Sequence, residues 1–374
     1  MRPRPDRIER LPEQYFTTLL ARVLAAGDDV IDVGRGNPDV PPPPHVIEAL
    51  AESARDGTPA VHGYPPFAGL RKAKEAIAER YAAVYGVELD PLLEVALLPG
   101  TTTALVELPL VLAERGERIL LPDPGYPDYR SGVALAGAEH VPLPLDDTGR
   151  PDWDGAPREN VAAVFLNYPA NPAAVAAPTG VFEEAIAFAQ ETGAAVVHDF
   201  AYGDLVFDGR RPESFLGVDG AGEVGVEMFS LSKSYGMAGW RLGFVLGYEE
   251  IVARLNLLQE HNRSGIFVPL QRAAIAALTG PQETVEERRA LYEGRRDRVL
   301  EAIPRARCEG SFFVWFPLPD GLTFERLLDE YRVAVAPGEG FGAQGRGYAR
   351  LSLATRDEAL DEGIARLRQA FADG

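Results

Sequence analysis

The segment EMFSLSKSYGMAGWRLGFVLG, residues 227–247, carries the clearest information about the fold. Its two ends, 227–232 and 243–247, are apolar and predict strands, and the turn between them holds a lysine and an arginine. Similar runs precede it: VALLP (95–99), RILLP (118–122), VAAVFLN (161–167) and AAVVHD (194–199), with helical stretches at 101–114, 125–137 and 180–192. Apolar strands alternating with helices are typical of a mainly parallel sheet covered on both faces, which predicts an α/β fold.

The remainder of the chain predicts an arm and a second, smaller unit. Helices are expected at 14–26, 45–55 and 69–85, an extended piece at 30–34, and mostly helix at 248–302 with a break at Gly280-Pro281. SFFVWFPL (311–318), YRVAVAP (331–337) and YARLSLA (348–354) then read as strands, with helices at 323–330 and 357–372. We therefore predict a large domain at 45–280, a small α+β domain at 281–374, and an arm at 1–44 that packs on the small domain. The length of 374 residues suits two domains.

Composition excludes several classes of partner. Lys and Arg number 37 against 56 Asp and Glu, a formal net charge of −19, so binding to nucleic acid or to an anionic membrane surface is not expected. The one cysteine, Cys308, cannot form a disulfide within the chain and suits a reducing compartment. With neither a secretory signal nor a long apolar span in the sequence, a cytoplasmic location is expected.

The 230–243 turn is the first candidate site. Lys233 follows an apolar strand, with Ser230 and Ser232 predicted on one side of that strand and Arg241 after a glycine-containing turn. These groups suit a phosphorylated aldehyde, because a lysine can form an imine while hydroxyls and a guanidinium hold the phosphate. The alternative is a solvated lysine and arginine on a loop.

HDFAYGDLVFDG (198–209) supplies a second candidate. Asp199 ends a buried strand, where a carboxylate is costly unless a cation accompanies it. The protonated ring nitrogen of a heteroaromatic cofactor would be such a cation, and Tyr202 could reach a phenolic oxygen on the same ring. A helix N-cap and a core tyrosine are the alternatives. In NYPANP (167–172), Asn171 could donate to that same oxygen, or simply form an Asn-Pro turn.

Three further motifs carry candidate residues. In LLPGTTTALVEL (97–108), Gly100, Thr101 and Thr102 lie where a strand meets a helix, a place suited to phosphate or to an ordinary N-cap. Tyr126 of PDPGYPDY (122–129) could stack on a flat cofactor or pack in a surface turn. Arg350 of GYARLSLA (347–354) lies within an apolar strand, where it requires a substrate carboxylate or a structural ion pair.

Two other patterns point to no site. The run Gly340 to Gly345 matches G-x-G-x-x-G, but strand-like sequence follows it, whereas a dinucleotide fingerprint opens a helix. The histidines lack metal-ligand spacing, so no metal is expected.

Taken together, PGTTTAL, PGYPDY, NYPANP, HDFAYGDLVFDG, SLSKSYGMAGWRLG and GYARLSLA resemble the class I/II aminotransferases of pyridoxal phosphate (PLP) fold type I. The similarity runs from IDVGRGNPD (31–39) to the final helix. HDFAYGDLVFDG, SLSKSYGMAGWRLG and QEHNRSGIFVPLQRAAIAAL (259–278) are most similar to the diaminopimelate and alanine aminotransferase-like branch.

The resemblance implies a PLP-dependent aminotransferase that moves an amino group from an L-amino acid to a 2-oxo acid, with a diaminopimelate-, alanine- or aspartate-type donor. It implies that Lys233 serves covalent attachment and proton transfer, and that Arg350 binds the substrate carboxylate. Around the cofactor ring it implies Asp199 at the pyridine nitrogen, Tyr202 and Asn171 at the phenolic oxygen, and Tyr126 on the ring. The residues implied at the phosphate are Gly100, Thr101, Thr102, Ser230, Ser232 and Arg241. Gly36 would let substrate approach the backbone, and Tyr64 would reach the phosphate from a neighbouring subunit, which implies a homodimer.

One departure and two alternatives accompany this resemblance. The family usually continues Asn-Pro with Thr-Gly, where this chain has Ala173-Ala174, so substrate preference does not transfer. A C–S β-lyase on the same fold is the first alternative. A PLP-binding transcriptional regulator is the second, disfavoured by the acidity and by the absence of a DNA-binding segment in the sequence. Arg35, Tyr15 and Phe16 could line a side-chain pocket or serve packing.

Overall fold

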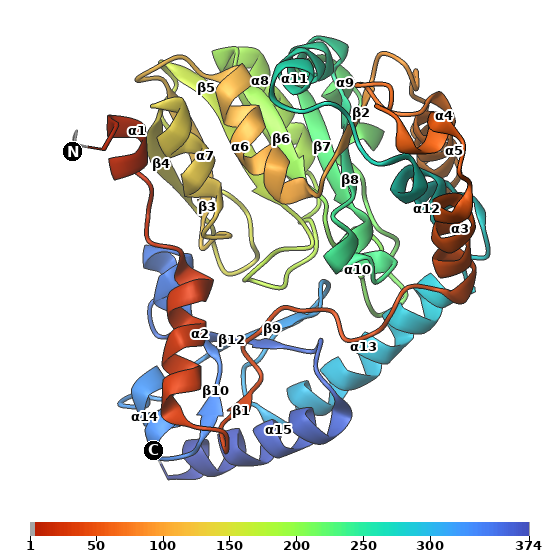
Figure 1. Ribbon diagram of the computed structural model, residues 1–374. Coiled ribbons are helices and arrows are strands. Elements are labelled where there is room, and N and C mark those ends of the chain that lie inside the picture. Colours follow the sequence, from red (N-terminus) through yellow and green to blue (C-terminus); the bar gives the residue numbers. More distant parts are fainter. Residues whose placement is uncertain (1–3, 374) are drawn as a thin grey trace.

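The computed structural model describes residues 4–373, and its centre is a seven-stranded sheet (Figure 1). The strand order is β2-β8-β7-β6-β5-β3-β4. The strands are β2 (Val95–Leu98), β3 (Arg118–Asp123), β4 (Glu139–Pro144), β5 (Val161–Asn167), β6 (Ala195–Asp199), β7 (Gly225–Ser230) and β8 (Gly243–Gly247). Only β8 runs opposite to the other six strands, so the predicted α/β class with a mainly parallel sheet is confirmed.

Helices cover both faces of this sheet. On one face lie α6 (Thr101–Leu112), α7 (Tyr129–Ala136) and α11 (Glu249–Asn262), whose apolar side chains share a core cluster with the strands. On the other lie α5 (Arg71–Tyr85), α8 (Val181–Thr192) and α12 (Val268–Thr279), with α3 (Pro44–Arg55) packed on α12. Strands buried on both sides explain the near-continuous apolar runs in the sequence.

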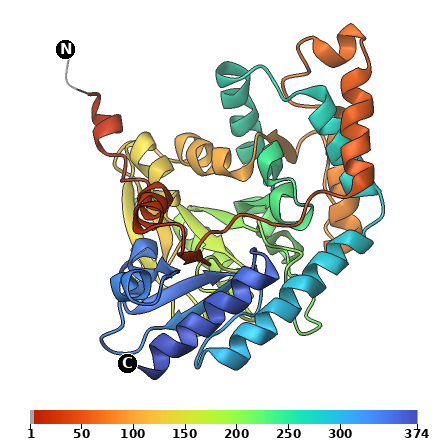
Figure 2. The ribbon, with the colours of Figure 1, turned by 60° about the horizontal axis from the view of Figure 1, so that its bottom comes forward.

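A smaller sheet lies below the large one in Figure 1. Its order is β11-β12-β9, all antiparallel, from β9 (Phe313–Pro317), β11 (Ala336–Pro337) and β12 (Tyr348–Ser352). The run 331–337 was predicted as one strand. That prediction is wrong, because β10 (Val333–Ala334) pairs with β1 (Ile31–Asp32) and only β11 joins the small sheet. Figure 2 shows the arm helix α2 (Tyr15–Ala26) beside these C-terminal elements, which include α14 (Phe324–Asp329) and α15 (Asp357–Ala372).

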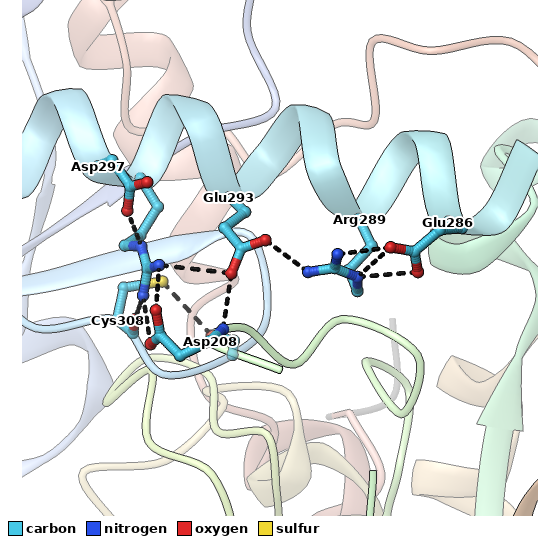
Figure 3. A network of polar contacts seen from close by, with 8 residues as sticks. Asp208, Glu286, Arg289, Glu293, Asp297 and Cys308 are labelled. Atoms are coloured by element: carbon cyan, nitrogen blue, oxygen red, sulfur yellow. Dashed lines mark hydrogen bonds and ion pairs between the residues drawn. The ribbon is translucent and has the colours of Figure 1, made fainter. Parts of the chain in front are cut away.

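Helix α13 (Glu283–Ala302) connects the two sheets, and its buried arginines form hydrogen bonds with segments of both. Arg295 donates to Asp39 at 2.8 Å and to the Leu353 carbonyl at 2.9 Å. Arg296 donates to both oxygens of Asp208, at 2.7 and 2.8 Å. Figure 3 shows the polar contacts on the Asp208 side of the helix, which continue through Glu293 and Arg289 to Glu286. Because Arg295 holds α13 against Asp39 of the arm and Leu353 of the small domain, we propose that the domain boundary lies before α13, near residue 281.

Candidate active site

A cavity of about 210 Å³ opens at the carboxyl ends of β5, β6 and β7. Parallel sheets place ligands at this edge. Most of the residues predicted from sequence line it: Gly36, Thr101, Thr102, Tyr126, Asn171, Asp199, Tyr202, Ser230, Ser232, Lys233, Arg241 and Arg350. Gly100 lies beside Arg241 but does not line the cavity. Tyr64 lies outside the cavity, and its side chain is 89% exposed.

Lys233 reaches the cavity from a turn of helix rather than from a strand. Strand β7 ends at Ser230, and Leu231–Ser234 form α10 because the Ser230 Oγ accepts the Ser232 N–H at 3.2 Å, as an N-cap does. The prediction that Ser230 and Ser232 alternate along a strand is therefore wrong, although both line the cavity.

The amine of Lys233 lies among cations and aromatic rings. Its Nζ is 5.0 Å from the ring centre of Phe312 and 5.7 Å from that of Tyr202. Within residues 4–373 no carboxylate lies within 4.0 Å of it. Burial, then Arg350 and Arg241, lower the pKa of Lys233 to about 8. The amine therefore loses its proton more easily than an ordinary lysine, as a nucleophile or base must.

Asp199 ends β6 beside Asn167 of β5 in the strand register. Its Oδ2 accepts the Tyr129 hydroxyl at 2.9 Å and its Oδ1 accepts the Ala201 N–H at 3.2 Å. Burial raises the pKa of Asp199, and these hydrogen bonds oppose the rise. The alternative of a helix N-cap is wrong, because turns rather than a helix follow Asp199.

Two asparagines connect Asp199 to the opposite side of the cavity. The Asn167 Nδ2 donates to the Asp199 carbonyl at 2.8 Å, and the Asn167 Oδ1 accepts the Asn171 N–H at 2.7 Å. The Asn171 Oδ1 accepts from Arg350 at 2.7 Å, which leaves its amide N–H groups to donate. Tyr202 is buried beside them, and burial raises its pKa.

Arg350 is a buried cation without a carboxylate partner among the described residues. Its guanidinium donates to Asn171 and, at 3.0 Å, to the Gly34 carbonyl, and it lies 3.9 Å from the ring centre of Phe313. Its Nε has no hydrogen-bond partner, and burial lowers its pKa to about 10. The alternative of a structural ion pair is therefore wrong, and the guanidinium is suited to an anionic ligand.

A phosphate-sized cradle faces this arginine across the cavity. Helix α6 begins at Thr101, directly after Gly100, so its first N–H groups lack helical partners. The Arg241 Nη2 is 3.5 Å from the Thr102 Oγ1. A Cβ at Gly100 would lie 2.2 Å from that Nη2, so only glycine leaves room for the arginine. Tyr126 also lines the cavity, and its hydroxyl donates to Asp128 at 2.9 Å.

These groups fit a phosphorylated pyridine aldehyde: a cradle for the phosphate, an amine for the aldehyde and a buried carboxylate for the ring nitrogen. Sequence reasoning missed Tyr129, Asn167 and Phe313. The first two lie inside PDPGYPDY and NYPANP, but no signal in the sequence indicated their roles, because their contacts with Asp199 form only between separate elements of the fold.

The fold and the site together define a PLP enzyme of fold type I. The chain belongs to the family of class I and II aminotransferases, whose model matches residues 28–367. It is 44% identical to the L-glutamine–4-(methylsulfanyl)-2-oxobutanoate aminotransferase of Bacillus subtilis (strain 168), over 96% of this chain and 94% of the relative. It is 41% identical to the LL-diaminopimelate aminotransferase of Desulforudis audaxviator (strain MP104C), over 97% and 96%.

Solved structures agree with this assignment. Substrate-bound BacF from Bacillus subtilis superposes with a TM-score of 0.93 at 36% identity, covering 99% of this chain and 98% of that chain. The protein is therefore a PLP-dependent aminotransferase acting on amino and 2-oxo acids, as the resemblance implied. The family assignment favours transamination over the lyase and the regulator. No helix within residues 4–373 is long and apolar enough to cross a membrane.

Proposed function

We propose that the enzyme transfers the amino group of an L-amino acid to a 2-oxo acid in two half-reactions at this one cavity. The observation that carries the proposal is the convergence of three groups: an amine with a pKa of about 8, a buried carboxylate and a buried guanidinium without a carboxylate partner in the described chain. Bound PLP supplies an aldehyde for covalent attachment and a ring that withdraws electrons.

The residues divide the remaining work. Arg350 binds the substrate α-carboxylate in two parallel hydrogen bonds, which orients the Cα–H bond toward Lys233. The neutral Lys233 Nζ accepts the Cα proton and holds it as an ammonium group. With PLP bound, Asp199 would keep the ring nitrogen protonated, and Asn171 and Tyr202 would hold the phenolic oxygen. Tyr126 would lie against the ring.

The phosphate has its own set of ligands in this proposal. They are Gly100, Thr101, Thr102, Ser230, Ser232 and Arg241, which surround the cradle at the start of α6. Gly36 admits substrate, because a Cβ there would lie 2.7 Å from the Phe313 Cζ and push this ring toward Arg350.

A lysine substitution tests the assignment. In Lys233→Ala, the visible absorbance of covalently attached cofactor and both half-reactions should be lost, whereas the exposed Lys72→Ala should retain both. Transamination by Lys233→Ala at the wild-type rate would overturn the proposal. Release of pyruvate and ammonia from cystathionine without a 2-oxo acid would instead favour the C–S β-lyase.

We also propose a homodimer in which Tyr64 completes the phosphate site of the neighbouring subunit. Tyr64, Phe67 and Phe267 are 89%, 49% and 47% exposed, and such a group of aromatic side chains is typical of an interface. The composition and the single cysteine support a cytoplasmic location.

Subunit mixing tests this shared site. Tyr64→Ala and Lys233→Ala should each be inactive alone, but a re-formed mixture should recover about a quarter of wild-type activity, because half of the dimers hold one intact site. Failure to recover activity in mixtures shown to contain hybrid dimers would contradict the role of Tyr64.

A further inference from the structure

A second hollow of about 460 Å³ adjoins the active-site cavity between α2 and residues 32–37. We call it the α2 chamber. It shares Phe16, Gly36 and Tyr126 with the cavity, so the two spaces lie side by side. The Gly34 carbonyl, which accepts from Arg350 at 3.0 Å, belongs to the same loop. A substrate held by its carboxylate on Arg350 therefore has this chamber directly beside it.

One wall of the α2 chamber is apolar. Phe16, Leu20 and Val23 follow a spacing of four and three residues and so lie on one face of α2, with Leu19 next to them. Phe16 and Leu20 are only partly buried, which leaves apolar surface for a ligand to cover.

The charged side chains of the opposite wall already have hydrogen-bond or ion-pair partners within the protein. The Asp32 Oδ1 accepts the Gly34 N–H at 2.9 Å, and its Oδ2 lies 3.8 Å from the Arg35 Nε. Asp128 accepts from the Tyr126 hydroxyl at 2.9 Å and from the Gln14 Nε2 at 2.8 Å. Two carboxylates and one arginine leave the chamber wall with one excess negative charge.

This wall disfavours charged side chains of either sign. A carboxylate brought from water would meet Asp32 and Asp128, with the one arginine already beside Asp32. The one excess negative charge would attract an ammonium group, but Asp128 already accepts two hydrogen bonds and Arg35 lies beside Asp32, so the ammonium group would gain no free partner for the hydration it loses. A charge that loses its hydration needs a free partner, whereas an uncharged extended side chain needs only the apolar face of α2.

We propose that the α2 chamber selects amino acids with extended, uncharged side chains, such as thioether, aliphatic or amide side chains, over dicarboxylic and basic donors. The inference rests on the proposed transamination and names the substrate class for that same site.

The first experiment compares donors on the holoenzyme. The spectral half-reaction is followed with methionine, leucine and glutamine, and with aspartate, glutamate, diaminopimelate and lysine. The kcat/KM of the best uncharged donor should exceed that of every charged donor by at least about tenfold. A charged donor that reacts faster overturns the inference while leaving the function intact. If no donor of either group reacts, the proposed function itself fails.

The second experiment fills the chamber. Leu20→Trp should lower the ratio of kcat/KM for methionine to that for alanine by about tenfold, because only the longer side chain needs the occupied space. Leu24→Trp is the matched control, since Leu24 is on the same helix, is 69% exposed and lies outside the chamber. Thr17→Trp, at an exposed chamber position, gives a second test should Leu20→Trp fold poorly.

Binding without turnover provides an independent readout. α-Methylmethionine has no Cα proton to lose, so it binds without transamination, and the difference in its dissociation constant between variants reports the contacts of its side chain. It should bind about tenfold more weakly to Leu20→Trp or Thr17→Trp than to Leu24→Trp. Equal binding to all three variants would overturn the inference.

Discussion

Replacing Tyr129 with phenylalanine removes one hydroxyl and leaves the buried ring in place. That hydroxyl donates to the Asp199 Oδ2 at 2.9 Å, and the other oxygen of Asp199 keeps only the Ala201 N–H. A hydrogen bond to a charged group is worth about 1.5–3 kcal/mol. At about 1.4 kcal/mol per unit, the pKa of Asp199 should rise by about one to two units.

The sign of the pH dependence follows from the direction of that pKa. Burial already raises the pKa of Asp199 in the folded protein. A carboxyl group of this kind lowers stability as the pH rises through its folded pKa, because the folded state holds the proton more tightly than the unfolded state. Tyr129→Phe extends this effect, so the lost stability should be greater at pH 8 than at pH 5.

Urea unfolding of the cofactor-free protein at these two pH values measures the effect. At pH 8 the loss should reach about 1.5–3 kcal/mol, and it should be clearly smaller at pH 5. Tyr168→Phe is the matched control, because its buried hydroxyl donates to the Gly149 carbonyl, which does not titrate. An equal loss at both pH values for Tyr129→Phe would refute the reasoning about Asp199.

Three further outcomes are expected. Lys233→Met should stabilise the cofactor-free protein at pH 7. The lysine has a pKa of about 8 when folded and 10.5 when unfolded, so the unfolded state binds the proton more tightly. The midpoints of urea unfolding should show that the gain in stability shrinks as the pH approaches 10.5. Arg350→Lys should reduce kcat/KM for amino acids by about 100-fold through loss of the paired hydrogen bonds, whereas the exposed Arg346→Lys should not. Gly36→Ala should raise the KM, because its Cβ would lie 2.7 Å from Phe313, the ring against Arg350.

Hydrophobic patterning predicted most of the large sheet, because its strands are buried on both faces. The run 161–167 and the helix 357–372 coincide with β5 and α15. The edge strand β4 was missed because EHVPLP holds two prolines and is only partly buried, features that disfavour a strand prediction. The turn of helix at 231–234 was missed because it depends on a single capping hydrogen bond.

The cavity was predictable where a charge stood in an apolar segment. Asp199 and Arg350 each required a partner outside their own strand, and the structure brings both to one cavity. Tyr129 was not predictable in this way, because its hydroxyl meets Asp199 only after β3, α7 and β6 have packed together. The place of Asn167 depends likewise on the register of β5 and β6, which sets it beside Asp199.

The Ala173-Ala174 departure shows how the fold absorbs a change of sequence next to the site. Ala174 adopts φ 57°, a left-handed conformation that costs a non-glycine residue about 1–2 kcal/mol. Its methyl group is fully buried, worth about 0.8 kcal/mol, and alanine saves about 0.4–1 kcal/mol of unfolded-state entropy relative to glycine. These terms nearly cancel.

Neighbouring segments hold this turn from both sides. The Ala174 carbonyl accepts the Glu309 N–H at 2.7 Å, and its N–H donates to Ala170 at 3.1 Å. Ala173 packs in a core cluster of the large sheet, whereas Ala174 packs in the cluster around the small sheet. Because both methyl groups enter cores and neither lines the cavity, the Ala173-Ala174 pair serves packing between the two clusters, and the Asn171 side chain remains on Arg350.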